Sequence, residues 1–344
     1  MVNLSTNRDF RQAFVTWSSL RHGLVDSDGT RIHYVADGPA DGPVVLFLHG
    51  FPELSYSWRY QLPAVAAAGY HAVALDVRGY GRSGKPSALE EYRMVRHVAD
   101  NVAIARQLEA DEVVVVGHDW GAPIAWSSSL LRPDLFSAAA LLSVPYSPPS
   151  VRPPTEVFAE LAGAEHEFYM NYFQRPGRAE AEVEEDVRRW VEGFYRAAAG
   201  DAPEGAGAAL AIIPRGERLV DRLPPAGAGS PSFLSADELE VYVATFELTG
   251  LTGGLNRYRN LDRDWADLAA FRGRPLKVPT LFVGGEKDGP TVWGANAIGR
   301  FATTVPDLRG AHILEGCGHW IQQERPDEVN ALLLAFLAEV RPVG

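Results

Sequence analysis

The stretch "EVVVVGHDWGAP", residues 112–123, decides the fold and contains one unusual feature. Its run of β-branched residues before Gly117 predicts a buried strand, and the following "APIAWSSSLL" predicts a helix. Asp119 therefore lies on a tight turn from strand to helix. A nucleophilic serine often occupies such a turn, within the motif G-x-S-x-G, whereas this chain carries a carboxylate there.

Short apolar strands alternate with helical segments on both sides of this turn. The strand candidates are residues 44–50, 71–77, 112–118, 138–144, 277–285 and 311–320. This alternation predicts a mostly parallel sheet with helices on both faces, and therefore the α/β class. Residues 21–146 and 274–344 are expected to form one core, which follows an N-terminal extension of residues 1–20.

The middle of the chain, residues 147–273, shows no strand pattern. Residues 181–199 and 235–250 each have the spacing of a helix, and the second begins with a capping box of Ser235 and Glu238. Residues 200–234 are rich in Gly, Ala and Pro, and are expected to form an extended or mobile loop. A helical cap, residues 147–273, is thus predicted to interrupt the core.

Composition disfavours several classes of partner. The 344 residues carry a formal net charge of −12 and no basic run, which disfavours nucleic acid and anionic membrane surfaces. No stretch approaches the ~20 apolar residues of a membrane span, and the charged N-terminus does not resemble a signal peptide. The single cysteine, Cys317, excludes an internal disulfide, and no Cys/His set has zinc spacing. We therefore expect a soluble cytoplasmic protein that holds no metal.

Asp119 has two interpretations. Aspartate is a favoured N-cap, so the residue could simply cap the following helix. However, the flanking Gly117 and Gly121 allow a strained turn and close helix–strand packing, neither of which a cap requires. The strand also ends where open α/β sheets bind their ligands. As a nucleophile, a carboxylate can displace a leaving group from a saturated carbon and form an ester, which water must then cleave.

Cleavage of that ester needs a general base, and His319 is the candidate because it lies in the glycine-flanked turn "GCGHW". Two acids, Glu286 and Asp288, compete to orient it. Asp288 is favoured, because it lies beyond the strand end and the segment "SVPYSPPS" offers no acid after the earlier strand. The chain order Asp119, Asp288, His319 matches the order nucleophile, acid, histidine of α/β hydrolases.

Two further motifs surround this set. In "HGFP", residues 49–52, the backbone N–H of Phe51 is expected to form an oxyanion hole together with that of Trp120. The motif "GYGRSG", residues 79–84, fits the dinucleotide pattern G-x-G-x-x-G, but it does not open a helix and no acid-ended second strand follows. The sequence therefore predicts no nucleotide cofactor.

Together these motifs resemble the α/β-hydrolase superfamily, and more narrowly the soluble-type microbial epoxide hydrolases. The matching segments are "HGFP", "DVRGYGRS" (76–83), "GHDWGA" (117–122), "GCGHW" (316–320), and in the cap "FYMNYFQRPGRAEAEVEEDV" (168–187) and "GGLNRYRN" (253–260). In that family two cap tyrosines hydrogen-bond the epoxide oxygen, and the resemblance implies Tyr169 and Tyr258 for this role. Phenol donors suit the reaction, because ring opening creates an alkoxide that needs a proton. The resemblance also makes a homodimer plausible.

The resemblance implies conversion of an epoxide and water to a vicinal diol. A cap rich in Tyr, Phe and Trp predicts a mostly apolar pocket for aryl or lipid-like epoxides. Residues next to the motifs are expected to help bind substrate, namely His49, Pro52, Phe173 and Trp320. A detoxifying and a biosynthetic role both stay open.

Two alternatives compete with this interpretation. A haloalkane dehalogenase would use the same Asp–His–Asp triad, with Trp120 and a cap tryptophan, Trp190 or Trp265, as halide donors. Phe51 stands where a donor asparagine is usual, and its side chain cannot donate. The second alternative is a non-catalytic binding protein with the same fold. Loss of a nucleophile, acid or base would indicate it, and none is missing.

Overall fold

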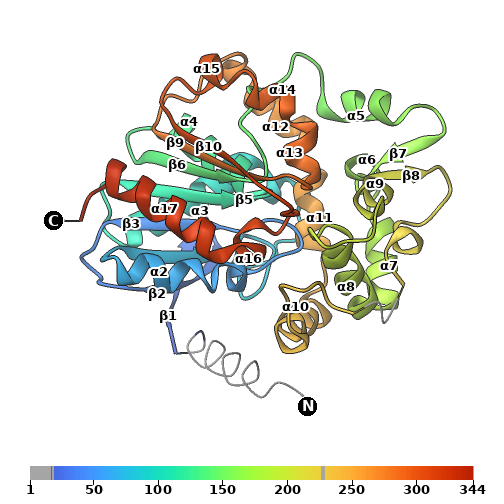
Figure 1. Cartoon of the computed structure of the whole chain (residues 1–344), viewed down its shortest axis with the longest axis horizontal. Coiled ribbons are helices and arrows are strands. Elements are labelled where there is room, and N and C mark those ends of the chain that lie inside the picture. The colour runs from blue at the N-terminus through green and yellow to red at the C-terminus, as the bar shows by residue number, and fades with distance from the viewer. Residues whose placement is uncertain (1–16, 18, 226–228, 344) are drawn as a thin grey trace.

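A computed structural model describes residues 17, 19–225 and 229–343. Its main sheet has eight strands in the order β1-β2-β4-β3-β5-β6-β9-β10 (Figure 1). Only the pairs β1–β2 and β2–β4 are antiparallel, so the predicted mostly parallel sheet is confirmed. The strands are β1 (Arg21–Ser27), β2 (Thr30–Asp37), β3 (Val44–Leu48), β4 (His71–Leu75), β5 (Val113–His118), β6 (Phe136–Leu142), β9 (Thr280–Gly285) and β10 (Leu308–Leu314).

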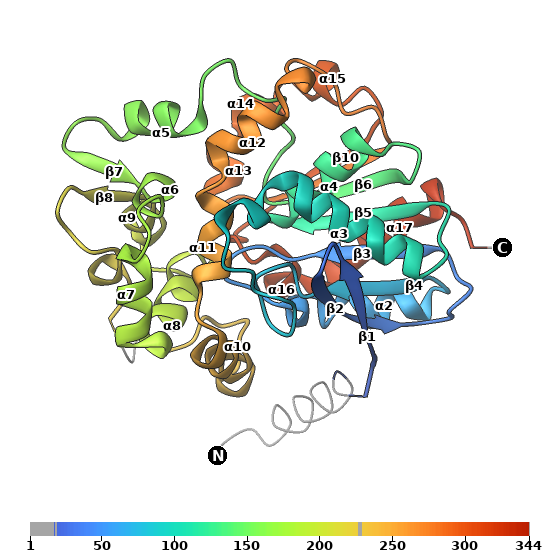
Figure 2. The ribbon, with the colours of Figure 1, turned by 180° about the vertical axis from the view of Figure 1, so that it is seen from behind.

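Helices cover both faces of this sheet. In Figure 1, α2 (Gln61–Ala67), α16 (Ile321–Glu324) and α17 (Pro326–Val340) lie in front, and Figure 2 shows α3 (Met94–Gln107) and α4 (Gly121–Leu131) on the opposite face. The four valines of β5 are divided between these faces. Val113 and Val115 join the hydrophobic cluster of α3 and α4, while Val114 and Val116 join that of α2 and α17. A strand buried on both faces has to be apolar at every position, which explains the valine run.

The elements between β6 and β9 lie together on one side of the sheet, at the right of Figure 1. We call residues 147–273 the cap and propose this boundary for it. Its elements are α5 (Pro154–Ala162), β7 (His166–Phe168), α6 (Tyr169–Tyr172), α7 (Arg178–Glu185), α8 (Val187–Ala197), α9 (Ala206–Ala211), β8 (Ile212–Pro214), η3 (Leu219–Arg222), α10 (Ala236–Thr249), α11 (Thr252–Tyr258) and α12 (Leu261–Asp267). The predicted capping box of Ser235 and Glu238 begins α10.

Three predictions for the cap are wrong in detail. The cap contains two strands, because β7 and β8 pair antiparallel, but three residues are too few to show a two-residue period. The single helix expected over 181–199 is divided at Asp186, whose side chain caps α8 by accepting a hydrogen bond from the Arg189 N–H. The expected loop of residues 200–234 contains α9, β8 and η3 in its described part.

Short elements complete the described chain. They are η1 (Ser55–Trp58), η2 (Leu89–Tyr92), η4 (Ala269–Phe271), α13 (Gly289–Trp293), α14 (Ala295–Ile298) and α15 (Phe301–Thr304). The expected N-terminal extension, residues 1–20, lies almost entirely outside the described residues. Within the described ranges, no helix combines the length and apolar character that crossing a membrane requires.

Candidate active site

The turn between β5 and α4 places Asp119 at the end of the central strand. Its φ of 49° lies in the left-handed region, which is strained for a residue other than glycine. The flanking glycines make the turn possible. A Cβ at Gly117 would lie 2.1 Å from the carbonyl oxygen of Gly121, and one at Gly121 would lie 1.9 Å from that of Leu48. The end of β5 and the start of α4 therefore lie in close contact, and the Asp119 side chain projects from the turn between them.

Asp119 does not act as the N-cap of α4. Trp120 occupies the N-cap position, and no side chain caps this helix end. Instead, Asp119 Oδ1 accepts a hydrogen bond from the backbone N–H of Phe51 at 2.8 Å, and the Trp120 N–H also bonds this carboxylate. The two N–H groups expected to form an oxyanion hole therefore meet at one carboxylate.

His319 lies between the two predicted acids of the triad. Its Nδ1 is 2.8 Å from Asp288 Oδ1, and its Nε2 is 3.7 Å from Asp119 Oδ2. Because an ionised carboxylate only accepts, Nδ1 carries the proton toward Asp288 and Nε2 faces Asp119. The competing acid, Glu286, is exposed and accepts a hydrogen bond from the Gly316 N–H. The structure thus joins Asp119, Asp288 and His319, and leaves Glu286 outside.

Charges and burial set the protonation of this triad. Burial would lower the pKa of His319, but the negative charges of Asp288 and Asp119 raise it to about 9. Burial raises the pKa of Asp119, although the charge of His319 opposes this rise. Burial would also raise the pKa of Asp288, but His319 and hydrogen bonds from hydroxyl groups lower it. These shifts favour an imidazolium at His319 paired with an ionised Asp288.

Ser143 is a member of the site that sequence reasoning missed. It follows β6 with a φ of 72°, and its Oγ lies 3.1 Å from His319 Nδ1. An orienting acid is the residue expected after such a strand, so the serine in "SVPYSPPS" carries no signal of its role. Thr291 was missed for the same reason, and its hydroxyl donates to Asp288 Oδ2 at 2.7 Å. Both hydroxyls help to fix the acid and the histidine.

A second missed feature is a buried ion pair behind the triad. Glu53 Oε2 accepts hydrogen bonds from the Gly50 N–H at 2.9 Å and from His118 Nδ1 at 2.7 Å. The other nitrogen of His118, Nε2, lies 2.7 Å from the backbone oxygen of His319. Both ring nitrogens of His118 are thus engaged, one by the Glu53 carboxylate and one by the backbone of the histidine turn. Burial would raise the pKa of Glu53, but the charge of His118 lowers it to about 2.

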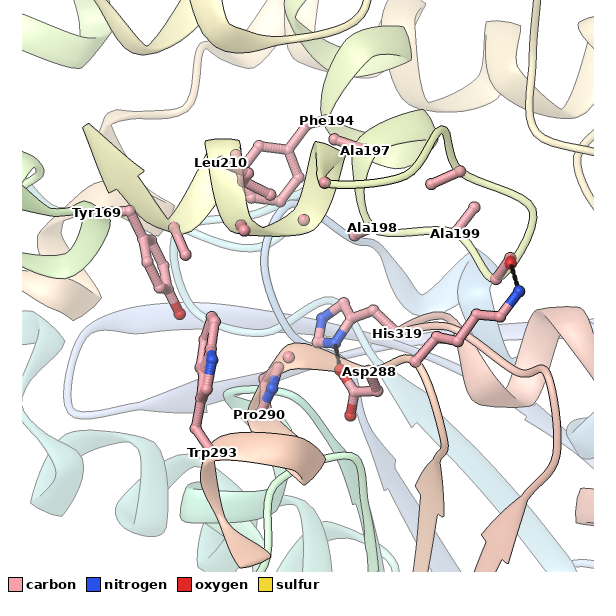
Figure 3. Close-up of a pocket in the computed structure, with 18 of the residues that line it drawn as sticks. Tyr169, Phe194, Ala197, Ala198, Ala199, Leu210, Asp288, Pro290, Trp293 and His319 are labelled. Carbon is pink, nitrogen blue, oxygen red and sulfur yellow. Dashed lines mark hydrogen bonds and ion pairs between the residues drawn. The ribbon is translucent and has the colours of Figure 1, made fainter. Parts of the chain in front are cut away.

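Tyr169 and Tyr258 both reach the cavity above Asp119. Their ring centroids are 6.0 Å apart, and Figure 3 shows Tyr169 pointing into the cavity. Burial raises the pKa of each well above its ordinary value, and the charge of Asp119 adds to this effect. A hydrogen bond from the side chain of Trp120 reaches Tyr258. Tyr172 is buried inside the cap, where its hydroxyl donates a hydrogen bond to Glu182.

The cavity has a volume of about 490 Å³ and is lined by aromatic rings and by small residues. The aromatic residues are Phe51, Tyr169, Phe194, Tyr258 and Trp293. The small residues, which we call the small-residue wall, lie between the end of α8 and the end of α9 and are Ala197, Ala198, Ala199, Gly200, Ala202, Gly205, Gly207, Ala208 and Ala211. Figure 3 shows the His319–Asp288 pair facing this space from the core side. Sequence reasoning missed Trp293 and the small-residue wall.

The four further residues expected to bind substrate do not line this cavity. His49 supports the turn, since its Nε2 accepts from the Val77 N–H at 3.0 Å. The Pro52 carbonyl accepts from the Tyr195 hydroxyl, and Phe173 packs against the ring of Phe51. Trp320 stacks on Tyr195 with ring centroids 4.2 Å apart. These residues lie behind the cavity lining and hold it in place.

Comparison with known proteins agrees with this geometry. The family profile described as alpha/beta hydrolase fold matches residues 43–326. Epoxide hydrolase A of Mycobacterium tuberculosis is 44% identical over 91% of this chain and 96% of its own length. Epoxide hydrolase B of the same organism is 40% identical over 93% and 99%, respectively. A solved epoxide hydrolase from an endophytic Streptomyces is 56% identical, with a TM-score of 0.90 over 94% of this chain and 96% of that one. The chain belongs to the α/β-hydrolase family and, within it, to the epoxide hydrolases, as the motifs predicted.

Proposed function

We propose that this epoxide hydrolase opens its substrate through a covalent ester on Asp119. The observation that carries the proposal is the orientation of the Asp119 carboxylate. Oδ1 is held by the Phe51 N–H at 2.8 Å, while Oδ2 faces the His319 ring at 3.7 Å. Oδ2 is therefore the oxygen that attacks an epoxide carbon, and the carbon–oxygen bond of the ring breaks. Oδ1 becomes the carbonyl oxygen of the ester and already lies in the oxyanion hole.

Tyr169 and Tyr258 supply the proton for this first step. Both hydroxyls stay protonated at neutral pH, because burial and the charge of Asp119 raise the pKa of each. As the ring opens, negative charge develops on its oxygen, and a phenol that donates a hydrogen bond transfers its proton to the alkoxide. The hydrogen bond from Trp120 orients Tyr258 for this role.

His319 acts in the second step. The charge of Asp119 contributes to its raised pKa, and ester formation removes that charge. The pKa of His319 therefore falls after the first step, and its Nε2 proton is released and restores the phenol that protonated the alkoxide. The free Nε2 can then take a proton from water. The resulting hydroxide adds to the ester carbonyl, and the bond between the carbonyl carbon and the substrate oxygen breaks. The substrate oxygen leaves as an alkoxide and takes up the proton of the new acid group on Asp119, so that the vicinal diol and the Asp119 carboxylate are released. Asp288 holds the ring and stabilises its charge.

The cavity favours an apolar substrate with a bulky aryl or lipid-like substituent. A volume of about 490 Å³ lies within the range of sites that enclose drug-sized molecules. Aromatic rings supply much of the apolar lining, and the small-residue wall leaves room for the substituent. A cytoplasmic location and a homodimer stay predictions.

Neither cap tryptophan that the dehalogenase alternative names as a halide donor lines this cavity. Trp190 and Trp265 are absent from the described cavity lining, and the Trp265 indole donates to the Ser150 carbonyl at 2.8 Å. The Trp120 side chain is engaged with Tyr258. The non-catalytic alternative loses support as well, since nucleophile, acid, base and phenol donors are all present around one cavity.

A paired assay tests the reaction. Purified protein receives racemic styrene oxide in one tube and a short bromoalkane in the other, without added cofactor. We expect diol without halide release, and halide without diol would overturn the proposal. A single turnover in water enriched in heavy oxygen tests the ester. The label is expected in Asp119 first, so the first diol formed is unlabelled.

A further inference from the structure

A second contact between cap and core lies beside the catalytic histidine. Residues 198–200, at the end of α8, touch the turn of residues 316–320. The His319 N–H donates to the Ala198 carbonyl at 2.8 Å. A Cβ at Gly318 would lie 2.2 Å from the Gly200 nitrogen, and one at Gly200 would lie 2.4 Å from the Gly316 oxygen. Only glycine at both positions permits this approach of one backbone to the other.

One carboxylate connects the two segments. Glu324, at the end of α16, accepts with Oε2 from the N–H groups of Gly200 and Gly318, each at 2.9 Å. Its Oε1 accepts from the Trp320 N–H at 3.0 Å. One donor therefore comes from the cap, and the other two come from the residues on either side of His319. Hydrogen bonds to a charged acceptor are about twice as strong as those between neutral groups.

Lys287 adds a second connection at the same point. Its Nζ donates to the Gly200 carbonyl at 2.8 Å, and its backbone N–H donates to the Cys317 carbonyl at 2.9 Å. Gly200 thus has its N–H fixed by Glu324 and its carbonyl fixed by Lys287. A shift of the cap backbone at Gly200 would therefore also move the turn of residues 316–320, because the side chains of Glu324 and Lys287 connect them.

We propose that Glu324 is a positioning residue that ties the cap to the turn of His319 and so sets the rate of ester hydrolysis. The inference rests on the proposed two-step mechanism. Asp119 is held by the β5–α4 turn and the Phe51 N–H, and it has no contact with Glu324 among those described. Attack on the epoxide therefore proceeds without Glu324. Hydrolysis depends on His319, whose neighbours on both sides bond this carboxylate.

Single-turnover kinetics with styrene oxide separate the two steps. In E324A we expect ester hydrolysis to slow by about tenfold or more, a loss of at least ~1.4 kcal/mol of transition-state stabilisation, while attack changes by less than about threefold. The ester then accumulates, and intact mass spectrometry with peptide mapping locates it on Asp119. E324Q is expected to lie between E324A and wild type, because its amide oxygen can still accept from Gly200 and Gly318.

Two further variants test the same contact between cap and core, so that the result does not depend on E324A being stably folded. G200A disturbs the same contact from the cap side and should give the same step-selective defect. K287M removes only the bond from Nζ to Gly200 and should give a smaller defect of the same kind. E328Q is the matched control, because Glu328 is exposed and pairs with Arg325 outside the contact. Its two rates should equal those of wild type.

The outcomes separate the inference from the mechanism on which it rests. Ester accumulation in E324A, with partial rescue in E324Q, supports the positioning role. Equal slowing of both steps, or no change in either, would overturn it. Absence of any adduct on Asp119 in the wild-type protein during turnover would instead overturn the two-step mechanism.

Discussion

His319 Nε2 lies 3.7 Å from Asp119 Oδ2, whereas its Nδ1 lies only 2.8 Å from Asp288 Oδ1. The shorter contact is a hydrogen bond, and the longer one exceeds hydrogen-bond length. His319 is thus fixed by Asp288 and faces Asp119, the proposed nucleophile, without being bonded to it. This asymmetry suits a ring that must accept a proton from a water molecule near Asp119 in the second step.

Removal of the acid should slow ester hydrolysis selectively. In D288N the ring loses its charged partner, so we expect the hydrolysis rate to fall by roughly 10² or more, with accumulation of the ester. Stopped-flow single turnovers measure both steps. E286Q is the matched control, because Glu286 is exposed and bonds only the Gly316 N–H among the contacts described. A rate of hydrolysis in D288N equal to that of wild type would contradict the assigned role.

Loss of the phenol hydroxyls should slow the first step instead. We expect Y169F and Y258F each to reduce the rate of attack by about tenfold or more, since general acid catalysis contributes ~10²–10⁴. The double variant should be nearly inactive. Y172F is the control, because the Tyr172 hydroxyl bonds Glu182 within the cap and does not reach the cavity. Attack rates that are unchanged in both single variants would remove the tyrosines from the mechanism.

The raised pKa of His319 predicts how stability depends on pH. Its pKa rises from an ordinary 6.5 to about 9 in the folded state. The folded protein therefore binds the proton more tightly, and this stabilisation is complete below pH 6.5 and lost as the pH rises through about 9. Melting temperatures of wild type and H319Q, measured across this range, should converge as the pH rises. A difference that grows with pH would contradict the charged triad.

The buried pair of Glu53 and His118 should contribute strongly to stability. In E53Q an amide replaces the buried carboxylate that bonds His118 and the Gly50 N–H, and breaking a buried pair in this way costs about 3–5 kcal/mol. Urea unfolding measures the change in the free energy of unfolding. E286Q, at an exposed site, is expected to remain within about 0.5 kcal/mol of wild type. An equally small effect of E53Q would show that the buried contact of Glu53 and His118 contributes little to stability.

The small-residue wall should control the size of substrate accepted. A208L adds a side chain on α9 that projects into the cavity, so kcat/KM for bulky epoxides should fall by about tenfold or more. The value for a small epoxide such as propylene oxide should change little. Equal losses for both substrates would indicate a general disturbance of the cap rather than a limit on size.

Local sequence predicted the core and singled out Asp119, Asp288 and His319, which the structure brings together, because strong patterns mark them. The valine run of β5, the glycines around Asp119 and the glycine-flanked turn of His319 each impose one local structure. The choice of Asp288 over Glu286 also followed from its place beyond the strand end. Each of these features is determined by residues that are close together in the sequence.

The features that were missed depend on contacts between distant segments. Ser143 meets His319 across 176 residues, and Glu53 meets His118 across 65. Trp293 and the wall of α9 reach the cavity only through the arrangement of the cap. Conversely, His49, Pro52, Phe173 and Trp320 neighbour the motifs in sequence, yet their side chains point into packing behind the lining. Their place next to the motifs predicted that these residues lie near the site, but it did not predict which way their side chains point.

The most direct test of the covalent mechanism is a trapping experiment with H319Q. This variant keeps Asp119 and both tyrosines but lacks the base for hydrolysis. After incubation with styrene oxide, intact mass spectrometry should show one added substrate mass per chain, and peptide mapping should locate it on Asp119. A wild-type protein that turns over the epoxide, paired with an H319Q protein that never gains this mass, would contradict the ester on Asp119.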